Sequence, residues 1–161
     1  MYIERIDDTS YVLHGITWDV YVEIDRARGD DVARPRLAYL DGDLEFIMPG
    51  EDHELRNKLL ARLLEAYSDV AGIELNGFGS TTYRNRIKRA GLEPDECYFV
   101  GPGTGKPRRV PTLVLEVSAT RTGVKKLEIY RRLGVHDRSD VRPRRCASID
   151  TGSATATSAL S

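Results

Sequence analysis

The segment Thr112-Leu113-Val114-Leu115-Glu116-Val117-Ser118 is the most apolar run of the chain, and it contains a carboxylate. A short apolar run of this kind is typical of a strand near the centre of a sheet. Strand alternation places Val114, Glu116 and Ser118 on one face. A carboxylate on a buried strand is costly unless it is paired, protonated or bound to a cation. Glu116 therefore marks this strand as a candidate functional position.

A second carboxylate opens the preceding predicted strand, residues 95–100. Asp95 follows Pro94, and proline is tolerated at a strand start because its missing N–H does least harm there. If the two strands are adjacent, Asp95 and Glu116 can converge. Two neighbouring carboxylates repel each other, and a divalent cation between them removes the conflict. Because oxygen ligands without a His or Cys cluster favour hard cations, the pair predicts Mg²⁺ or Mn²⁺ rather than Zn²⁺.

A lysine follows on the next predicted helix, which Thr122 can cap and which ends at Leu133-Gly134. Lys126 lies three and four residues before Ile129 and Tyr130, so these side chains share the face that we expect to pack on the sheet. An inward lysine beside two carboxylates can orient or deprotonate an attacking water, or stabilise charge developing on phosphorus. The alternative is a lysine whose stem covers the edge of the core while its amine stays in water.

Each candidate acid also has a structural interpretation. Asp95 can be a turn residue at a strand start, and Glu116 can form a structural bridge with an arginine. Glu45 lies on the second strand of a predicted hairpin, where a solvent-facing position is the simpler interpretation. His53 is expected in the first turn of a helix, and that position needs no metal to explain it.

A short helix and a β-hairpin are predicted in the first third of the chain. Thr17 can cap a helix that ends near Gly29. Further on, Asp41-Gly42-Asp43 lies between the apolar runs 36–40 and 44–48. Asp-Gly in this setting is a strong signal for a two-residue hairpin.

A longer helix is predicted over about residues 53–71, with Asp52 as its N-cap and Gly72 ending it. Its apolar residues recur at helical spacing. This pattern favours a buried core face over a groove for a partner. The stripe consists of Leu55, Leu59, Leu63, Tyr67 and Val70, with Leu60 and Leu64 beside it.

The composition indicates a globular, cytoplasmic chain. Its 161 residues fit one domain, and 40% are hydrophobic and 30% charged. No run approaches the roughly 20 apolar residues of a membrane span, and the N-terminus lacks a signal-peptide pattern. Cys97 and Cys146 form no metal-type or redox-type pair, which favours a reducing cytoplasm.

The net charge of −1 hides an asymmetry along the chain. Residues 1–55 contain 14 Asp and Glu against 5 Arg, whereas residues 56–161 contain 19 Lys and Arg against 11 acids. The basic part can face a polyanion. The alternative is a set of ordinary solvated faces, because charge patterning alone is weak evidence of a partner.

Taken together, these segments resemble the Uma-two-type family, described as restriction endonucleases of the PD-(D/E)XK nuclease superfamily. The resemblance covers about residues 15–135. The matching segments include Leu40-Asp41-Gly42-Asp43-Leu44-Glu45 and the stretches 48–49, 53–54, 79–82, 91–98, 115–117, 126–130 and 133–135.

The resemblance implies an α/β fold in which a mixed central sheet is flanked by the two later helices, within a domain of residues 1–135. It also implies a metal-dependent endonuclease that hydrolyses DNA, with Asp95 and Glu116 as metal ligands and Lys126 as the catalytic lysine. Glu45 and His53 match acidic and histidine positions near that site, and the resemblance makes them further catalytic candidates. The superfamily usually places its lysine two residues after the glutamate; here that position is Ser118, and the lysine lies on the following helix.

The chain departs from the family pattern after Val135. Residues 136–161 contain Arg-Pro-Arg-Arg followed by a Ser/Ala/Thr-rich end without periodicity, so we expect a disordered or degenerate tail. The sheet would then lack an edge strand. Two alternatives to the nuclease follow: a catalytically inactive module that binds nucleic acid or protein, and a truncated remnant. Many nucleases of this type act as pairs, so a homodimer is also an expectation.

Overall fold

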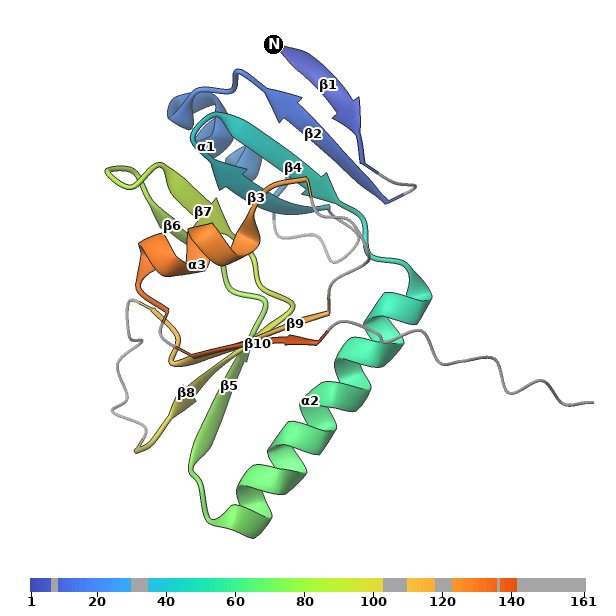
Figure 1. Ribbon diagram of the computed structural model, residues 1–161, viewed down its shortest axis with the longest axis vertical. Helices are drawn as coiled ribbons and strands as arrows, with labels where there is room; N and C mark the ends of the chain where they lie inside the picture. The colour runs from blue at the N-terminus through green and yellow to red at the C-terminus, as the bar shows by residue number, and fades with distance from the viewer. Residues whose placement is uncertain (7–8, 30–34, 103–109, 118–122, 136, 142–161) are drawn as a thin grey trace, which may run out of the picture.

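The computed structural model describes residues 1–6, 9–29, 35–102, 110–117, 123–135 and 137–141. Within them the chain forms three helices and ten strands, and the strands are divided between two sheets (Figure 1). This arrangement confirms the predicted α/β class with flanking helices. No helix in the described part of the chain is both long and apolar enough to cross a bilayer.

The larger sheet has six strands and is antiparallel throughout. The predicted hairpin lies in this sheet, with Leu40 opposite Asp43. Asp41 and Gly42 both have positive φ, 52° and 110°, as a two-residue turn that follows the strand twist requires. In spatial order the strands are β1 (Tyr2–Arg5), β2 (Ser10–His14), β4 (Asp43–Ile47), β3 (Arg36–Leu40), β7 (Ala90–Leu92) and β6 (Tyr83–Asn85).

The first helix, α1 (Trp18–Ala27), has the predicted cap: the hydroxyl of Thr17 accepts a hydrogen bond from the Val20 amide at 3.3 Å. It packs on the large sheet through Tyr21, whose ring stacks on that of Tyr39 with centroids 4.8 Å apart. Both tyrosines are fully buried. This contact belongs to a small aromatic and aliphatic core between α1 and the β3–β4 hairpin.

The smaller sheet is mixed and holds the two strands that the sequence singles out. Its order is β10 (Asp137–Val141), β9 (Leu113–Val117), β8 (Glu96–Val100) and β5 (Leu75–Gly79). The pairs β9–β8 and β8–β5 are antiparallel, whereas β10 runs parallel to β9.

Helix α3 (Lys126–Leu133) lies against β7 of the large sheet, and its apolar face joins the main core (Figure 1). Ile129 and Tyr130 are buried there beside Cys97 and Val114 of the small sheet. Lys125 occupies the N-cap position, and Thr122, which the sequence predicts as the cap, lies outside the described residues. Gly134 ends the helix in a left-handed conformation, as expected.

Helix α2 (Glu51–Ala71) differs from the prediction in two respects. Its N-cap is Gly50, without a side-chain cap, rather than Asp52. The side facing the sheet carries Asn57, Ala61 and Ser68, which are buried, and the predicted core stripe is wrong. The exposed residues are Leu55, Leu59, Leu63, Tyr67 and Val70. Helical period identifies residues that share a face, but only the packing of α2 on β9 decides which face is covered.

The small sheet continues past the predicted domain end at Val135. Instead of a tail beginning at residue 136, the main chain of Asp137–Val141 forms β10 and pairs with β9 in register, Asp137 opposite Leu113. An edge strand of this kind depends on main-chain hydrogen bonds, which any sequence without proline can provide. The rest of the predicted tail, residues 142–161, lies outside the described residues.

Candidate active site

Two carboxylates meet where β8 begins and β9 ends. The antiparallel register pairs Glu96 with Leu115, so one further step places Asp95 opposite Glu116. The Val117 amide donates a hydrogen bond to Asp95 Oδ2 at 2.7 Å, which ties the two chain segments together. Asp95 is 3% and Glu116 7% exposed. The structure thus brings together two buried acids that are 21 residues apart in sequence.

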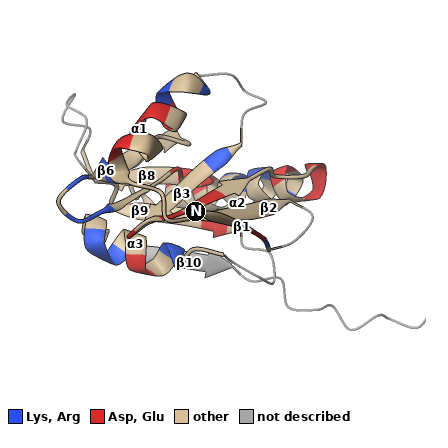
Figure 2. Cartoon of the chain, turned by 90° about the horizontal axis from the view of Figure 1, so that it is seen from above, with Lys and Arg blue, Asp and Glu red and all other residues tan. Residues whose placement is uncertain are grey.

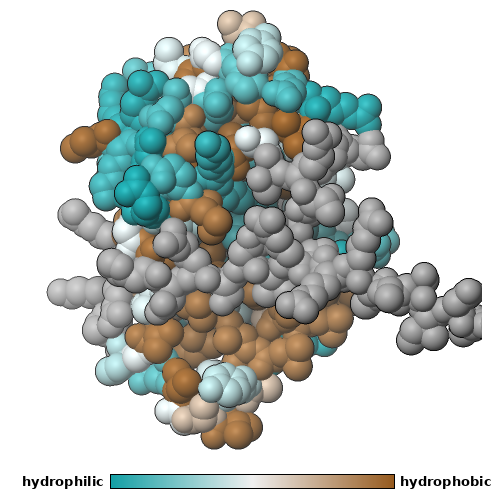
Figure 3. Space-filling view, viewed as in Figure 1, coloured by the Kyte–Doolittle hydropathy of each residue, from teal (hydrophilic) through white to brown (hydrophobic). Residues whose placement is uncertain are grey.

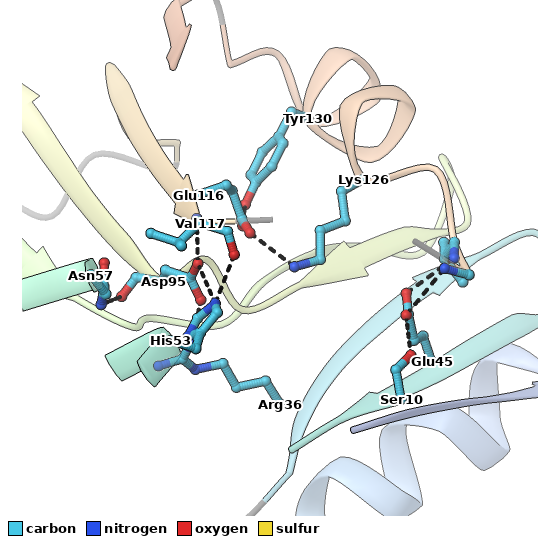
Figure 4. A network of polar contacts seen from close by, with 12 residues as sticks. Ser10, Arg36, Glu45, His53, Asn57, Asp95, Glu116, Val117, Lys126 and Tyr130 are labelled. Atoms are coloured by element: carbon cyan, nitrogen blue, oxygen red, sulfur yellow. Dashed lines mark hydrogen bonds and ion pairs between the residues drawn. The ribbon is translucent and has the colours of Figure 1, made fainter. Parts of the chain in front are cut away.

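Helix α3 supplies two hydrogen-bond partners of Glu116. Lys126 Nζ lies 2.8 Å from Glu116 Oε2, and the hydroxyl of Tyr130 donates to Glu116 Oε1 (Figure 4). Because Lys126 and Tyr130 are four residues apart, they project from the same face of the helix. The lysine points inward, as predicted. Tyr130 was expected only to pack in the core, because helical spacing does not show where its hydroxyl points.

Asp95 is held from the other side by two basic groups. Arg36, from β3 of the large sheet, forms an ion pair with Asp95 Oδ1 and another with Glu54 at 2.8 Å. His53, in the first turn of α2, places Nε2 3.2 Å from Asp95 Oδ2. Arg36 was not predicted as a site residue, since only the packing of the two sheets brings it near Asp95.

His53 also contacts the backbone of β9. Its Nε2 lies 2.7 Å from the carbonyl oxygen of Val117, so one N–H points between that carbonyl and Asp95. One turn along α2, the amide of Asn57 faces the carbonyl oxygen of Asp95. His53 Nδ1 and Asn57 Oδ1 are buried and without a hydrogen-bond partner among the described residues. The hydroxyl of Tyr21, in the core beneath α1, also has no such partner among the described residues, so this feature is not confined to the candidate site.

The surroundings shift the pKa values of the two carboxylates in opposite directions. Burial raises the pKa of Glu116, although the ammonium group of Lys126 acts against it. Burial also favours the neutral form of Asp95, but the hydrogen bond from His53 and the charges of Lys126 and Arg36 outweigh it and lower the pKa of Asp95. Adjacent acids with divergent pKa values are characteristic of catalytic sites.

Lys126 and His53 both bind their protons more tightly than usual. Burial acts to lower the pKa of Lys126, but the charges of Glu116 and Asp95 dominate and raise it. The hydrogen bond to Asp95 raises the pKa of His53 despite its partial burial. Lys126 is therefore an ammonium ion at neutral pH, beside one carboxylate and close to a second.

Glu45, the third candidate acid, lies apart from this cluster (Figure 4). It is 2% exposed, so the solvent-facing interpretation is wrong. Its carboxylate accepts hydrogen bonds from the hydroxyl of Ser10 and from the amides of Gly123 and Val124, at 3.2 and 3.0 Å for the two amides. Glu45 thus holds the segment immediately before Lys126.

The donor set suits a small hard cation. Among the described residues, no three His, Cys, Asp or Glu side chains gather as a metal centre. Asp95, Glu116 and the Val117 carbonyl nevertheless offer oxygen atoms within one small region. Mg²⁺ commonly binds through one or two carboxylates and keeps several waters, so a site with two acids is sufficient for it. Three basic side chains, Arg36, His53 and Lys126, face the two acids and complement their negative charge.

The comparisons with known proteins agree with this site only at the level of family. Neither the curated proteins nor the solved structures provide a significant match. The model of the Uma2 family, described as "Putative restriction endonuclease", matches residues 18–147. This span includes all five predicted site residues and most of the chain. The chain therefore belongs to the Uma2 family of restriction-endonuclease-like proteins.

Proposed function

We propose that this protein is a cytoplasmic endonuclease that uses Mg²⁺ or Mn²⁺ to hydrolyse phosphodiester bonds of DNA. The observation that supports it most strongly is the meeting of Asp95 and Glu116 on neighbouring strands, beside the inward-facing Lys126. Family membership supports the same reaction class.

In this proposal Asp95, Glu116 and the carbonyl of Val117 would hold the cation. Bound there, it would act as a Lewis acid and would provide an activated water for phosphodiester hydrolysis. His53 and Arg36 keep the Asp95 carboxylate ionised and oriented toward Glu116. Tyr130 fixes one oxygen of Glu116, leaving the other to face Lys126.

Lys126 has an electrostatic role in this proposal. Its Nζ lies 2.8 Å from Glu116 Oε2, beside the place where we propose that the cation binds. An ammonium group in this position is suited to stabilising the negative charge that develops on the phosphoryl group. The Lys126 amide also donates to the Val124 carbonyl at 2.8 Å, so the start of α3 is fixed to the segment that Glu45 holds.

The charge distribution supports a polyanionic substrate. Basic residues gather on β6, in the β6–β7 turn and at the end of α3 (Figure 2). Those that are exposed are Arg84, Arg86, Lys88, Arg89 and Arg131. Several have acidic neighbours, such as Asp19 beside Arg86 at 3.0 Å, so we expect moderate DNA affinity that falls as salt rises.

The direct test is nicking of supercoiled DNA by the purified chain with Mg²⁺ and with excess chelator. Asp95→Asn should abolish cleavage, whereas Glu96→Gln, one residue further on the same strand, should retain it. Glu96 is a suitable control because it pairs with Lys58 on the surface rather than with the site. Equal nicking by all three proteins, or nicking that survives the chelator, would refute the proposal.

A second candidate is a module that binds nucleic acid without cutting it. The favouring observation is that every oxygen of Asp95 and Glu116 already has a partner within the chain. This candidate predicts salt-dependent DNA binding that is unchanged in Asp95→Asn, with no cleavage by the unmodified chain.

A further inference from the structure

Helix α2 exposes an unusual amount of apolar surface. Leu59 is 50% exposed, Leu63 67% and Val70 91%, and Leu55 and Tyr67 are exposed beside them. The helix lies along one edge of the molecule, and the smaller sheet contacts it from the opposite side (Figure 1). Apolar residues gather over the lower part of the molecule, where α2 and β5 lie (Figure 3). A contiguous apolar face of this kind indicates an interaction surface.

The spacing of these residues matches one side of a two-helix seam. Leu59, Leu63, Ala66 and Val70 follow each other at intervals of four, three and four residues, which is the a/d repeat of paired helices. We call these four residues the α2 seam. Ala61 and Ser68, which are buried against the small sheet, lie on the other side of the helix. The seam is therefore the outer face of a helix whose inner face is already used.

Two charged residues beside the α2 seam indicate that its partner is a second copy of the same helix. Arg62 and Asp69 are seven residues apart, flank the seam on the same side and are both exposed. Neither has an ion pair among the described residues. If two α2 helices pack antiparallel about a two-fold axis, the Arg62 of each lies beside the Asp69 of the other, and Leu59 lies opposite Val70. A parallel pair would instead bring Arg62 toward Tyr67, without a charge partner. The face is thus complementary to itself in the antiparallel arrangement only.

We propose that two copies of this chain associate through the α2 seam in antiparallel orientation. The 21-residue helix is about 31 Å long, which is enough for the four seam layers and the flanking ion pairs. His53 and Asn57 project from the side of α2 that faces the small sheet, so association leaves the candidate active site uncovered. The proposal does not depend on nuclease activity and can be tested without DNA.

The experiment is sedimentation equilibrium of the full chain over a range of concentrations, with circular dichroism to verify helix content. The unmodified protein should approach twice its 18.1 kDa mass. Leu63→Arg and Val70→Glu should both sediment as folded monomers; Val70 is so exposed that its substitution cannot disturb the core. A monomeric unmodified chain, or a dimer that survives both substitutions, overturns the proposal.

Charge exchange identifies the orientation. Arg62→Asp and Asp69→Arg, made singly, each replace two attractive contacts by two repulsive ones and should raise the dimer dissociation constant roughly tenfold or more. The double variant restores both ion pairs with reversed sign and should recover most of that loss. Arg26→Asp on α1, also an exposed helical arginine, is the control and should change nothing. A double variant no better than the single ones would overturn the antiparallel arrangement.

Discussion

Two buried glutamates show how the same side chain serves different purposes in this fold. Glu45 lies in the middle of β4 and Glu116 near the end of β9, and both are almost fully buried. Glu45 is satisfied by a hydroxyl and two main-chain amides, which are fixed parts of the fold. Glu116 is satisfied by the ends of two side chains, Lys126 and Tyr130.

This difference separates a structural carboxylate from a candidate catalytic one. Main-chain donors cannot leave without unfolding a segment, so Glu45 is committed to holding the start of α3. The flexible Lys126 side chain can move and leave Glu116 Oε2 to a cation, while the buried Tyr130 keeps its hydrogen bond to Oε1. Glu116 also lies opposite a second acid, Asp95, whereas the hydrogen-bond partners of Glu45 among the described residues are a hydroxyl and two amides. Substitution should therefore damage activity at Glu116 and stability at Glu45.

The largest expected effect is on DNA cleavage. Glu116→Gln keeps the shape of the side chain but removes its charge, so we expect the cleavage rate to fall by roughly a thousandfold or more. Glu45→Gln, assayed at a temperature where it is folded, should stay within about tenfold of the unmodified protein. Initial rates of plasmid nicking measure both. Similar losses in the two variants would remove the distinction between the two glutamates.

Lys126 should show the next largest effect. Lys126→Met keeps an apolar stem of similar length and removes the ammonium group, and we expect a loss of roughly 100- to 1,000-fold in rate. Lys125→Met is the matched control, because Lys125 is exposed at the N-cap and should tolerate the change. Retention of full activity by Lys126→Met would assign this lysine to packing alone.

Loss of the hydrogen bonds to Glu45 should lower the free energy of unfolding. Glu45→Gln leaves a single acceptor oxygen for the two amides and the Ser10 hydroxyl, so we expect a loss of about 1–3 kcal/mol in unfolding free energy. Gly123→Ala should have a similar effect, because an added Cβ would lie 2.2 Å from Val12 Cγ2. Urea denaturation with fluorescence of the single tryptophan, Trp18, measures both. Unchanged stability in both variants would contradict the anchoring role.

The smallest expected effect is on stability and concerns the ion pair between Asp41 and Arg132 at the surface. The hydrogen bond from Arg132 lowers the pKa of Asp41 below its ordinary value of 3.8, so this pair stabilises the fold above that pH and loses its effect as the pH falls through the lowered pKa. Because both groups are partly exposed, Arg132→Gln should cost less than about 1 kcal/mol at pH 7. The difference from the unmodified protein should shrink in acid. A difference in unfolding free energy between Arg132→Gln and the unmodified protein that grows as the pH falls would contradict this prediction.

Local sequence signals predicted the elements that depend on few residues. The Asp41-Gly42 turn and the Thr17 cap are confirmed because each is determined by the conformation or hydrogen bonding of one or two residues. Sequence spacing also predicted that Asp95, Glu116 and Lys126 can converge, and the structure places them together.

Features that depend on packing between distant elements were not predictable. Arg36 reaches Asp95 from the other sheet, and no local pattern distinguishes it from a surface arginine. The different burial of α2 and α3 also depends on packing. Both helices have an apolar stripe at helical period, so the sequence pattern alone does not show which stripe is covered. The α3 stripe meets β7 and is buried, whereas the α2 stripe lies on the side away from β9.

The most direct test of the candidate site is binding of Mn²⁺ in the absence of DNA, measured by calorimetry and by electron paramagnetic resonance of the free ion. We predict one site per chain, lost in Asp95→Asn and in Glu116→Gln and kept in Glu45→Gln, which removes a buried carboxylate that lies elsewhere. Absence of Mn²⁺ binding to the unmodified chain, or binding that persists when both Asp95 and Glu116 are replaced, would contradict it.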